Sequence, residues 1–197
     1  MFIQVVQGKC TREEELRAHL ERWREEQGSK AEGWLGGTYG FTDDHEFLGI
    51  VRFESREAAM ANSDREEQST WARELMALMD GPVEFHDCDD VTLMLDGGSD
   101  DAGFVQVIRG KVEDVERAKA MMTRDATMLH EMRPEIIGAT MAVEDDGTFT
   151  ETVFFTDEAS ARKGEQQEPP PQVREELETL MAGATFYDLH HPWFASR

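Results

Sequence analysis

Side chains suited to acid–base chemistry stand on two expected strands of the first half of the sequence. His86 lies in the stretch PVEFHDC, where period-two alternation puts Glu84, His86 and Cys88 on one strand face. A histidine there could act as a general base near neutral pH or make a structural hydrogen bond. Arg52, in the middle of an earlier strand, could hold an anionic substrate oxygen or pair with a neighbouring carboxylate.

Three further residues have types that suit the wall of a small-molecule pocket. Tyr39 offers a phenol on the second expected strand, where it could equally pack in the core. Trp71 shares i, i+4, i+7 spacing with Leu75 and Leu78, and a core tryptophan would show the same pattern as one that walls a pocket. Asn62 stands at a break between two helical segments and could cap a helix end.

The histidines near the C-terminus and the two cysteines do not have the spacing of a metal site or of a C-x-x-C motif. His190 and His191 are adjacent, so their side chains point apart in an extended segment, and no third ligand is spaced to join them. We therefore expect no metal. Cys10 and Cys88 form no C-x-x-C pattern and are expected to be reduced, structural thiols.

The charge balance excludes several classes of partner. The 197 residues include 42 acidic and 20 basic side chains, which gives a formal charge of -22. Such a surface repels phosphate backbones and anionic lipid headgroups, so neither nucleic acid nor a membrane is an expected partner. No apolar run approaches the ~20 residues of a membrane span, and the chain opens directly into a strand with no basic leader. We expect a cytoplasmic protein.

The sequence resembles itself at a shift of 102 residues. FIQVVQGK at 2–9 matches FVQVIRGK at 104–111, and the match continues without a gap through Gly36 and Gly138, Phe53 and Phe155, and Leu75 and Leu177. A period near 100 residues is the size of a small domain and indicates a duplicated, fused domain. We expect one repeat at 1–96, a Gly/Asp-rich linker at 97–103 and a second repeat at 104–197.

Each repeat has the pattern of a ferredoxin-like β-α-β-β-α-β unit. In the first repeat we expect strands at 2–8, 33–42, 46–53 and 83–95, a helix between the first two strands, and a broken helix over 55–62 and 70–79. In the second, Asp146-Gly147 supplies the positive φ of a tight hairpin. The strands are apolar on both faces, and helices cover only one face. We therefore expect an α+β protein whose two antiparallel sheets pack into an intramolecular barrel, a pseudo-dimeric monomer open to further self-association.

The stretches FIQVVQGK, GWLGGTYGFTDDHEFLGIVRFES and NSDREEQSTWARELMALMDGPVEFHD resemble the dimeric α+β barrel proteins. The resemblance is in particular to antibiotic-biosynthesis-monooxygenase-like members in the tandem form found in single chains, and it covers about residues 1–194. The resemblance implies a pocket between helices and sheet, walled by a helix tryptophan and a nearby asparagine. In oxygenase members an electron-rich substrate is deprotonated there and reacts directly with oxygen. Trp71 lies on the matching helix, and Asn62 lies at the break before it.

The resemblance leaves two functions open. One is a cofactor-independent monooxygenase for a small aromatic or quinone-like substrate, with His86, Arg52 and Asn62 catalytic and Trp71 and Tyr39 binding the substrate. The other is a non-catalytic, ligand-binding or structural barrel. Haem-degrading members use a helix histidine, which is missing from 55–80, so no cofactor is expected. At the 102-residue shift all five candidates change, with His86 opposite Asp188, so the expected site belongs to the first repeat.

Overall fold

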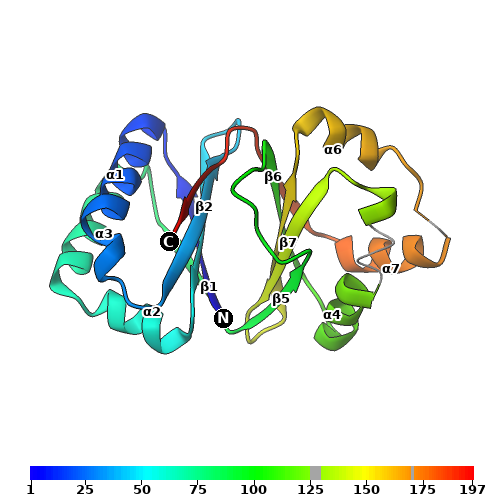
Figure 1. The fold of residues 1–197 in the computed structure, drawn as a ribbon, viewed down its shortest axis with the longest axis horizontal. Helices are drawn as coiled ribbons and strands as arrows, with labels where there is room; N and C mark the ends of the chain where they lie inside the picture. Colours follow the sequence, from blue (N-terminus) through cyan, green and yellow to red (C-terminus); the bar gives the residue numbers. More distant parts are fainter. Residues whose placement is uncertain (125–129, 170) are drawn as a thin grey trace. The chain divides into compact units, whose positions relative to one another are not determined.

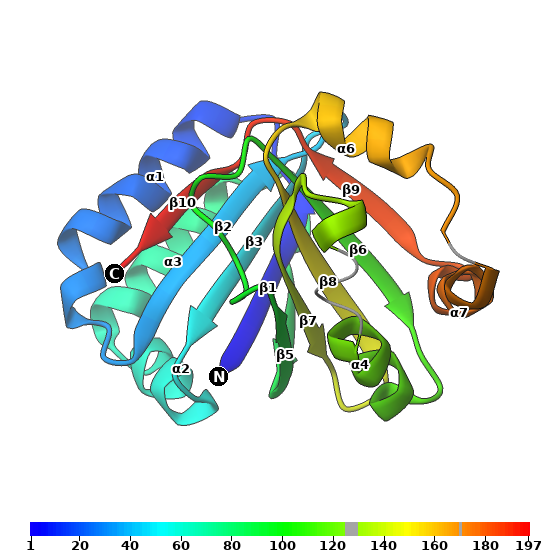
Figure 2. The same cartoon turned by 45° about the vertical axis from the view of Figure 1, so that its right-hand side comes forward.

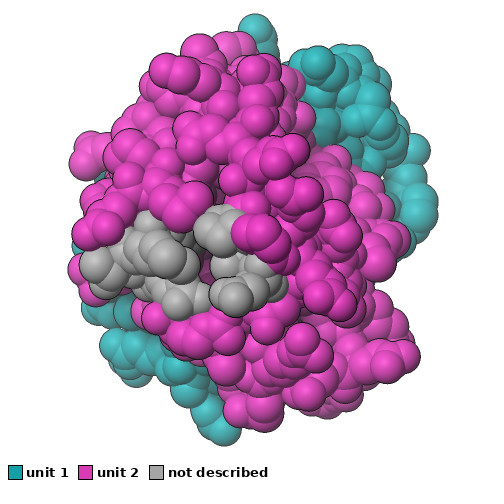
Figure 3. Space-filling view, turned by 90° about the vertical axis from the view of Figure 1, so that its right-hand side faces the viewer, with its two compact units in different colours: residues 1–89, 193–197 teal, residues 90–192 magenta. Residues whose placement is uncertain are grey.

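The computed structural model describes residues 1–124, 130–169 and 171–197, with the backbone alone at 172 and 173. The chain forms two compact units, which Figure 3 colours separately. Unit 1 contains Met1–Asp89 and Trp193–Arg197, and unit 2 contains Asp90–Pro192.

Unit 1 is an antiparallel five-stranded sheet with helices over one face (Figure 1). The strand order is β10-β2-β3-β1-β4, and Figure 2 shows β10 beside β2. The strands are β1 (Phe2–Lys9), β2 (Trp34–Phe41), β3 (Glu46–Phe53), β4 (Glu84–Cys88) and β10 (Trp193–Ser196). The helices are α1 (Glu13–Glu26), the short 3-10 helix η1 (Gly28–Lys30), α2 (Arg56–Ser63) and α3 (Glu66–Leu78).

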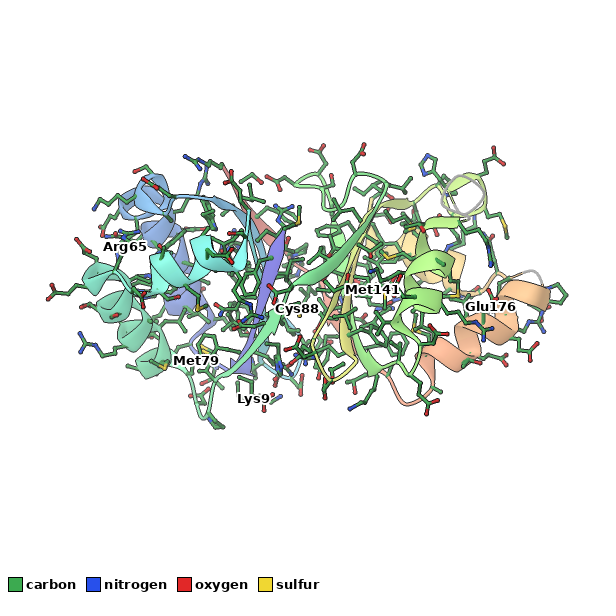
Figure 4. All side chains as sticks on the ribbon, turned by 90° about the horizontal axis from the view of Figure 1, so that it is seen from below. Lys9, Arg65, Met79, Cys88, Met141 and Glu176 are labelled. Carbon is green, nitrogen blue, oxygen red and sulfur yellow. The ribbon has the colours of Figure 1, made fainter. Side chains whose placement is uncertain are left out.

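Unit 2 repeats this architecture with the strand order β5-β7-β8-β6-β9. Its strands are β5 (Asp90–Met94), β6 (Phe104–Lys111), β7 (Ile136–Val143), β8 (Thr148–Phe155) and β9 (Thr185–Leu189). Its helices include α4 (Val115–Arg124), α6 (Glu158–Glu165) and α7 (Pro171–Met181). Figure 4 labels Met141 on the sheet and Glu176 in the helical layer.

Alternation along the strands explains why both faces of each sheet are apolar. On β1, Phe2 and Val6 point toward the helices and join the core of unit 1. Ile3 and Val5 point to the opposite face and are also fully buried. The α+β class with two antiparallel sheets is therefore confirmed, as is the positive φ of Gly147, which is 83°.

None of the helices in the described parts of the chain is long and apolar enough to span a membrane.

The expected single strand at 83–95 is wrong. The strand is interrupted at Asp89. As a result β4 pairs with β1 in unit 1, while β5 pairs with β7 in unit 2. The C-terminal β10 pairs with β2 in unit 1. The units therefore divide at Asp89 and Pro192. The repeat boundaries at 97–103 and the packing of the two sheets into a barrel stay predictions.

The ungapped shift of 102 residues also fails at the last strand of each repeat. His86 pairs with Val5, and the residue that pairs with Val107 in the same way is Tyr187. The structural counterpart of His86 is thus Tyr187 and not Asp188. The pairs of β1 with β3 and of β6 with β8 do keep the shift of 102, because Phe2 meets Phe53 as Phe104 meets Phe155.

Candidate functional site

Unit 1 contains a cavity of about 480 Å³ between its sheet and its helices. Its floor is one row of residues across four strands, because Tyr39 pairs with Gly49, Gly49 with Val6, and Val6 with Phe85. We call these four residues the floor row. Phe85, which lines the cavity from the edge strand β4, is 50% exposed.

Two glycines make room for the ring of Tyr39 at one end of the floor row. A Cβ atom at Gly37 would lie 2.8 Å from Cε2 of Tyr39 and closer still to its hydroxyl, which leaves space only for glycine. A Cβ atom at Gly49 would lie 3.2 Å from Cδ1 of the same ring. The ring also stacks on Trp193 of β10, with centroids 5.7 Å apart. Tyr39 is therefore held flat against the sheet.

Burial raises the pKa of Tyr39, so its hydroxyl stays protonated across the physiological range. The charge of Arg52 opposes this shift but is the weaker cause. Within the described part of the chain, no residue forms a hydrogen bond with this hydroxyl. The side chain is 5% exposed and lines the cavity. Tyr39 can therefore donate a hydrogen bond to a bound molecule.

The wall opposite the floor is aromatic and is provided by α1 and α3. Trp71 stacks on His19, with ring centroids 4.7 Å apart and planes 9° from parallel. Nε2 of His19 donates to the backbone carbonyl of Trp71 at 3.1 Å, and Nδ1 accepts from Arg22 at 2.7 Å. Burial, as the main cause, lowers the pKa of His19, which favours the neutral ring that this pattern requires. Trp23 is the second tryptophan of this wall, and its ring centroid lies 6.0 Å from that of Trp71.

Asn62, the only asparagine in the sequence, is 6% exposed and lines the cavity. Its Oδ1 accepts a hydrogen bond of 3.0 Å from Nη1 of Arg65. The other guanidinium nitrogen of Arg65 donates to Gln27 at 2.6 Å, which holds the arginine in place. Since the oxygen is engaged, the amide Nδ2 is the end that is free to donate to a ligand.

Two glutamines add polar groups of fixed orientation. Oε1 of Gln68 accepts from the indole of Trp23 at 2.7 Å, so the amide nitrogen of Gln68 is its available donor. Nε2 of Gln4 donates to Asp87 at 2.8 Å, so the oxygen of Gln4 is its available acceptor. None of the described residues that line the cavity carries a carboxylate or an imidazole, and Arg73 is the charged one.

The structure brings together three of the five residues singled out from the sequence. Tyr39, Asn62 and Trp71 line the cavity. Arg52 and His86 pair with Ile3 and Val5, whose side chains point to the face away from the helices. The sheet therefore separates Arg52 and His86 from this cavity. Nε2 of His86 lies 3.4 Å from the carboxylate of Glu84 on its own strand.

Sequence reasoning missed the polar groups contributed by Gln4 and Gln68 and the stacking partner His19. A signal was present for Gln4, because a polar residue at the centre of the apolar strand FIQVV faces the same side as Phe2 and Val6. His19 and Trp71 are 52 positions apart on different helices, so no local pattern in the sequence indicates that they stack. In the part of the chain that the structure describes, no three His, Cys, Asp or Glu side chains lie close enough together to hold a metal ion.

The solved structures that are similar over almost the whole chain include the following three. A candidate monooxygenase from Lactobacillus acidophilus NCFM has a TM-score of 0.72 and 12% identity, with 95% of this chain and 92% of that chain covered. An anthrone oxidase-like protein has a TM-score of 0.70 and 12% identity, with coverage of 100% and 93%. A ferredoxin fold protein of Listeria monocytogenes 4b F2365, related to antibiotic biosynthesis monooxygenases, has a TM-score of 0.52 and 10% identity, with coverage of 100% and 94%.

This chain has their fold. The sequence itself matches no protein-family profile, and no curated protein matches it. The resemblance to the antibiotic-biosynthesis-monooxygenase-like ferredoxin fold is thereby confirmed as a likeness of architecture. Because a fold hosts many activities, the function must be argued from the cavity.

Proposed function

We propose that the cavity of unit 1 binds a small aromatic or quinone-like molecule and that the protein is a cofactor-independent monooxygenase acting on it. The observation that carries the proposal is the buried amide of Asn62, which lines an aromatic-walled cavity and whose Oδ1 already accepts from Arg65, so that Nδ2 is its available donor. The cavity volume of about 480 Å³ lies in the range of small-molecule sites. The fold shared with monooxygenase-like proteins supports the same reading.

The polar groups suit a planar molecule with oxygens on its rim. Trp71 offers a ring face for stacking, and aromatic pairs contribute ~0.5 to 1.5 kcal/mol beyond burial. The amide nitrogens of Asn62 and Gln68 and the hydroxyl of Tyr39 donate hydrogen bonds, and the oxygen of Gln4 accepts one. A quinol or hydroxylated polycycle has matching groups.

The chemistry follows from what the described lining contains. It offers no carboxylate or imidazole base, so the proposed substrate is one acidic enough to lose its proton to water, such as an acidic phenol or the doubly activated methylene of an anthrone. Asn62 Nδ2 then donates to the oxyanion and stabilises it. The anion passes electrons to O₂ and forms a carbon–oxygen bond. The second oxygen atom leaves as water, so a methylene becomes a carbonyl without an external reductant.

A second candidate function is binding without turnover. The same lack of a carboxylate or imidazole in the described lining favours it, because no protein group there takes up the substrate proton. Roles for Arg52 and His86 in this cavity are not part of either proposal, since both lie on the opposite face of the sheet.

The sequence allows a direct binding test. Protein labelled with [¹⁵N]asparagine shows a single side-chain amide, that of Asn62, and we expect this signal to shift on titration with a dihydroxynaphthalene. Trp71→Phe should weaken the affinity by about 2- to 13-fold, which is ~0.5 to 1.5 kcal/mol. Trp34→Phe is the matched control, because Trp34 is 2% exposed and does not line the cavity.

Turnover is tested by oxygen uptake with the dihydroxynaphthalene and with an anthrone. Asn62→Asp preserves shape and an acceptor for Arg65 but replaces the donor with a negative charge, so we expect a loss of about 10²-fold in kcat. Binding that depends on Trp71 without any oxygen uptake would leave the binding function and refute the enzyme. An Asn62 signal that stays unmoved by either ligand would refute both.

A further inference from the structure

Unit 2 contains, at the centre of its sheet, a carboxyl group that has no ion-pair or hydrogen-bond partner among the described residues. Glu151 lies on β8 between Phe149 and Val153, which both belong to the hydrophobic core of this unit. Its neighbours across the sheet are Ile108 on β6 and Met141 on β7, and these are buried core residues as well. Alternation therefore points Glu151 into the apolar layer between sheet and helices.

The position corresponds to the cavity of unit 1. Strand pairing places Glu151 where unit 1 has Gly49, in the middle of the floor row. The same row in unit 2 consists of Met141, Glu151, Ile108 and Phe186. Unit 2 thus has a carboxylate side chain at the place where unit 1 has Gly49, which carries no side chain into the cavity.

Other charged side chains around this layer are paired with one another. Glu151 forms no ion pair or hydrogen bond with any described residue. The pairs that the neighbouring strands and helices contribute are Asp90 with Lys119, Asp188 with Arg162, and Glu176 with Arg117 and Arg124.

An unpaired carboxylate in an apolar layer is costly, and sequences seldom retain one without a function. Burial alone raises the pKa of Glu151 from 4.5 to about 7. The side chain nevertheless keeps partial exposure, so solvent reaches it. At neutral pH the carboxyl of Glu151 is therefore partly ionised, and a cationic partner would stabilise its ionised form.

We propose that unit 2 carries a second ligand site, in which the carboxylate of Glu151 binds the protonated nitrogen of a small apolar amine. The carboxylate supplies the acceptor, and Ile108, Met141 and the half-exposed Phe186 supply the apolar contacts. The net charge of -22 draws cations toward the molecule.

The proposal predicts a linkage between binding and pH. Only the ionised carboxylate pairs with the ammonium group, so below the pKa of Glu151 the amine must displace a proton. With a pKa of about 7, the ionised fraction is about tenfold smaller at pH 6 than at pH 8. The affinity for the amine should fall by about tenfold over that interval, and binding at pH 6 should release close to one proton.

The test uses 1-naphthylmethylamine and its neutral counterpart 1-naphthylmethanol in isothermal titration calorimetry at both pH values. Two buffers of different ionisation enthalpy report the proton release. All four tryptophans of the sequence, Trp23, Trp34, Trp71 and Trp193, belong to unit 1, so tryptophan quenching separately reports any binding there. Glu151→Gln is isosteric, and its folding is checked by circular dichroism. Glu178→Gln, an exposed change on α7, is the charge-matched control.

We expect the amine to bind more tightly than the alcohol at pH 8. Glu151→Gln should weaken amine binding by at least about tenfold and remove its pH dependence. Glu178→Gln should leave both unchanged. The proposal is overturned if the amine does not bind, if it binds no better than the alcohol, or if the pH dependence survives in Glu151→Gln.

Discussion

The raised pKa of Glu151 has a consequence for stability that needs no ligand. The unfolded chain ionises this carboxyl near 4.5, whereas the folded protein ionises it near 7. Below the lower value the carboxyl is protonated in both states, so its ionisation contributes nothing to the free energy of unfolding. Between the two values only the unfolded state ionises, so the free energy of unfolding falls by ~1.4 kcal/mol per pH unit from this group. Above pH 7 the full penalty, about 3 kcal/mol, is present.

Glu151→Gln removes this penalty without changing the shape of the side chain. Partial exposure of the carboxyl reduces the effect, so we expect the variant to be ~2 kcal/mol more stable than the parent at pH 8 and equally stable at pH 4.5. Urea unfolding at a series of pH values measures the difference. Circular dichroism follows both units and tryptophan fluorescence follows unit 1, so a transition confined to unit 2 is visible as a divergence between them. Glu178→Gln is again the control.

The reasoning is refuted if the gain in stability from Glu151→Gln is the same at pH 4.5 and pH 8. Such a result would mean that the carboxyl ionises in the folded protein as it does in the unfolded chain. A loss of stability at pH 8 would refute it as well, since it would reveal a hydrogen bond that the glutamine cannot replace.

Two further predictions concern the support of the unit 1 cavity. Trp193→Ala should lower the free energy of unfolding by ~3 to 5 kcal/mol, because the ring is 8% exposed and packs on Tyr39 and Phe41. A urea-measured loss below ~1 kcal/mol would show that β10 is dispensable. Gly37→Ala should cost ~1 to 3 kcal/mol and weaken dihydroxynaphthalene binding, because the new methyl group displaces the ring of Tyr39. Unchanged tryptophan quenching by that ligand would contradict this.

Local pattern was sufficient for most elements of the fold. The expected strands at 33–42 and 46–53 correspond to β2 and β3, and the broken helix corresponds to α2 and α3. These segments are recognisable because apolar periodicity and Gly or Asp turn residues act over a few positions. The α+β class followed from the order of these elements.

Strand partners were beyond the reach of that pattern. Residues 83–95 are expected to form one strand, yet an interruption at Asp89 sends β4 and β5 to different sheets. Pairing depends on hydrogen bonds between segments far apart in the sequence, and an edge strand has the same composition whichever sheet it joins. The same limit hid the one-residue change of register that makes Tyr187 the counterpart of His86.

The sequence by itself determined which residue types were available for a site: an aromatic helix face at Trp71, an amide at Asn62 and a phenol at Tyr39. Only the tertiary structure decided which of them share a cavity. Strand alternation turns each side chain to one face, but the sequence does not say which face the helices cover. The helices cover the sheet face that carries Tyr39, so Trp71, Asn62 and Tyr39 share the cavity while Arg52 and His86 lie on the other face. In unit 2 the same arrangement puts Glu151 in the apolar layer, with no partner among the described residues.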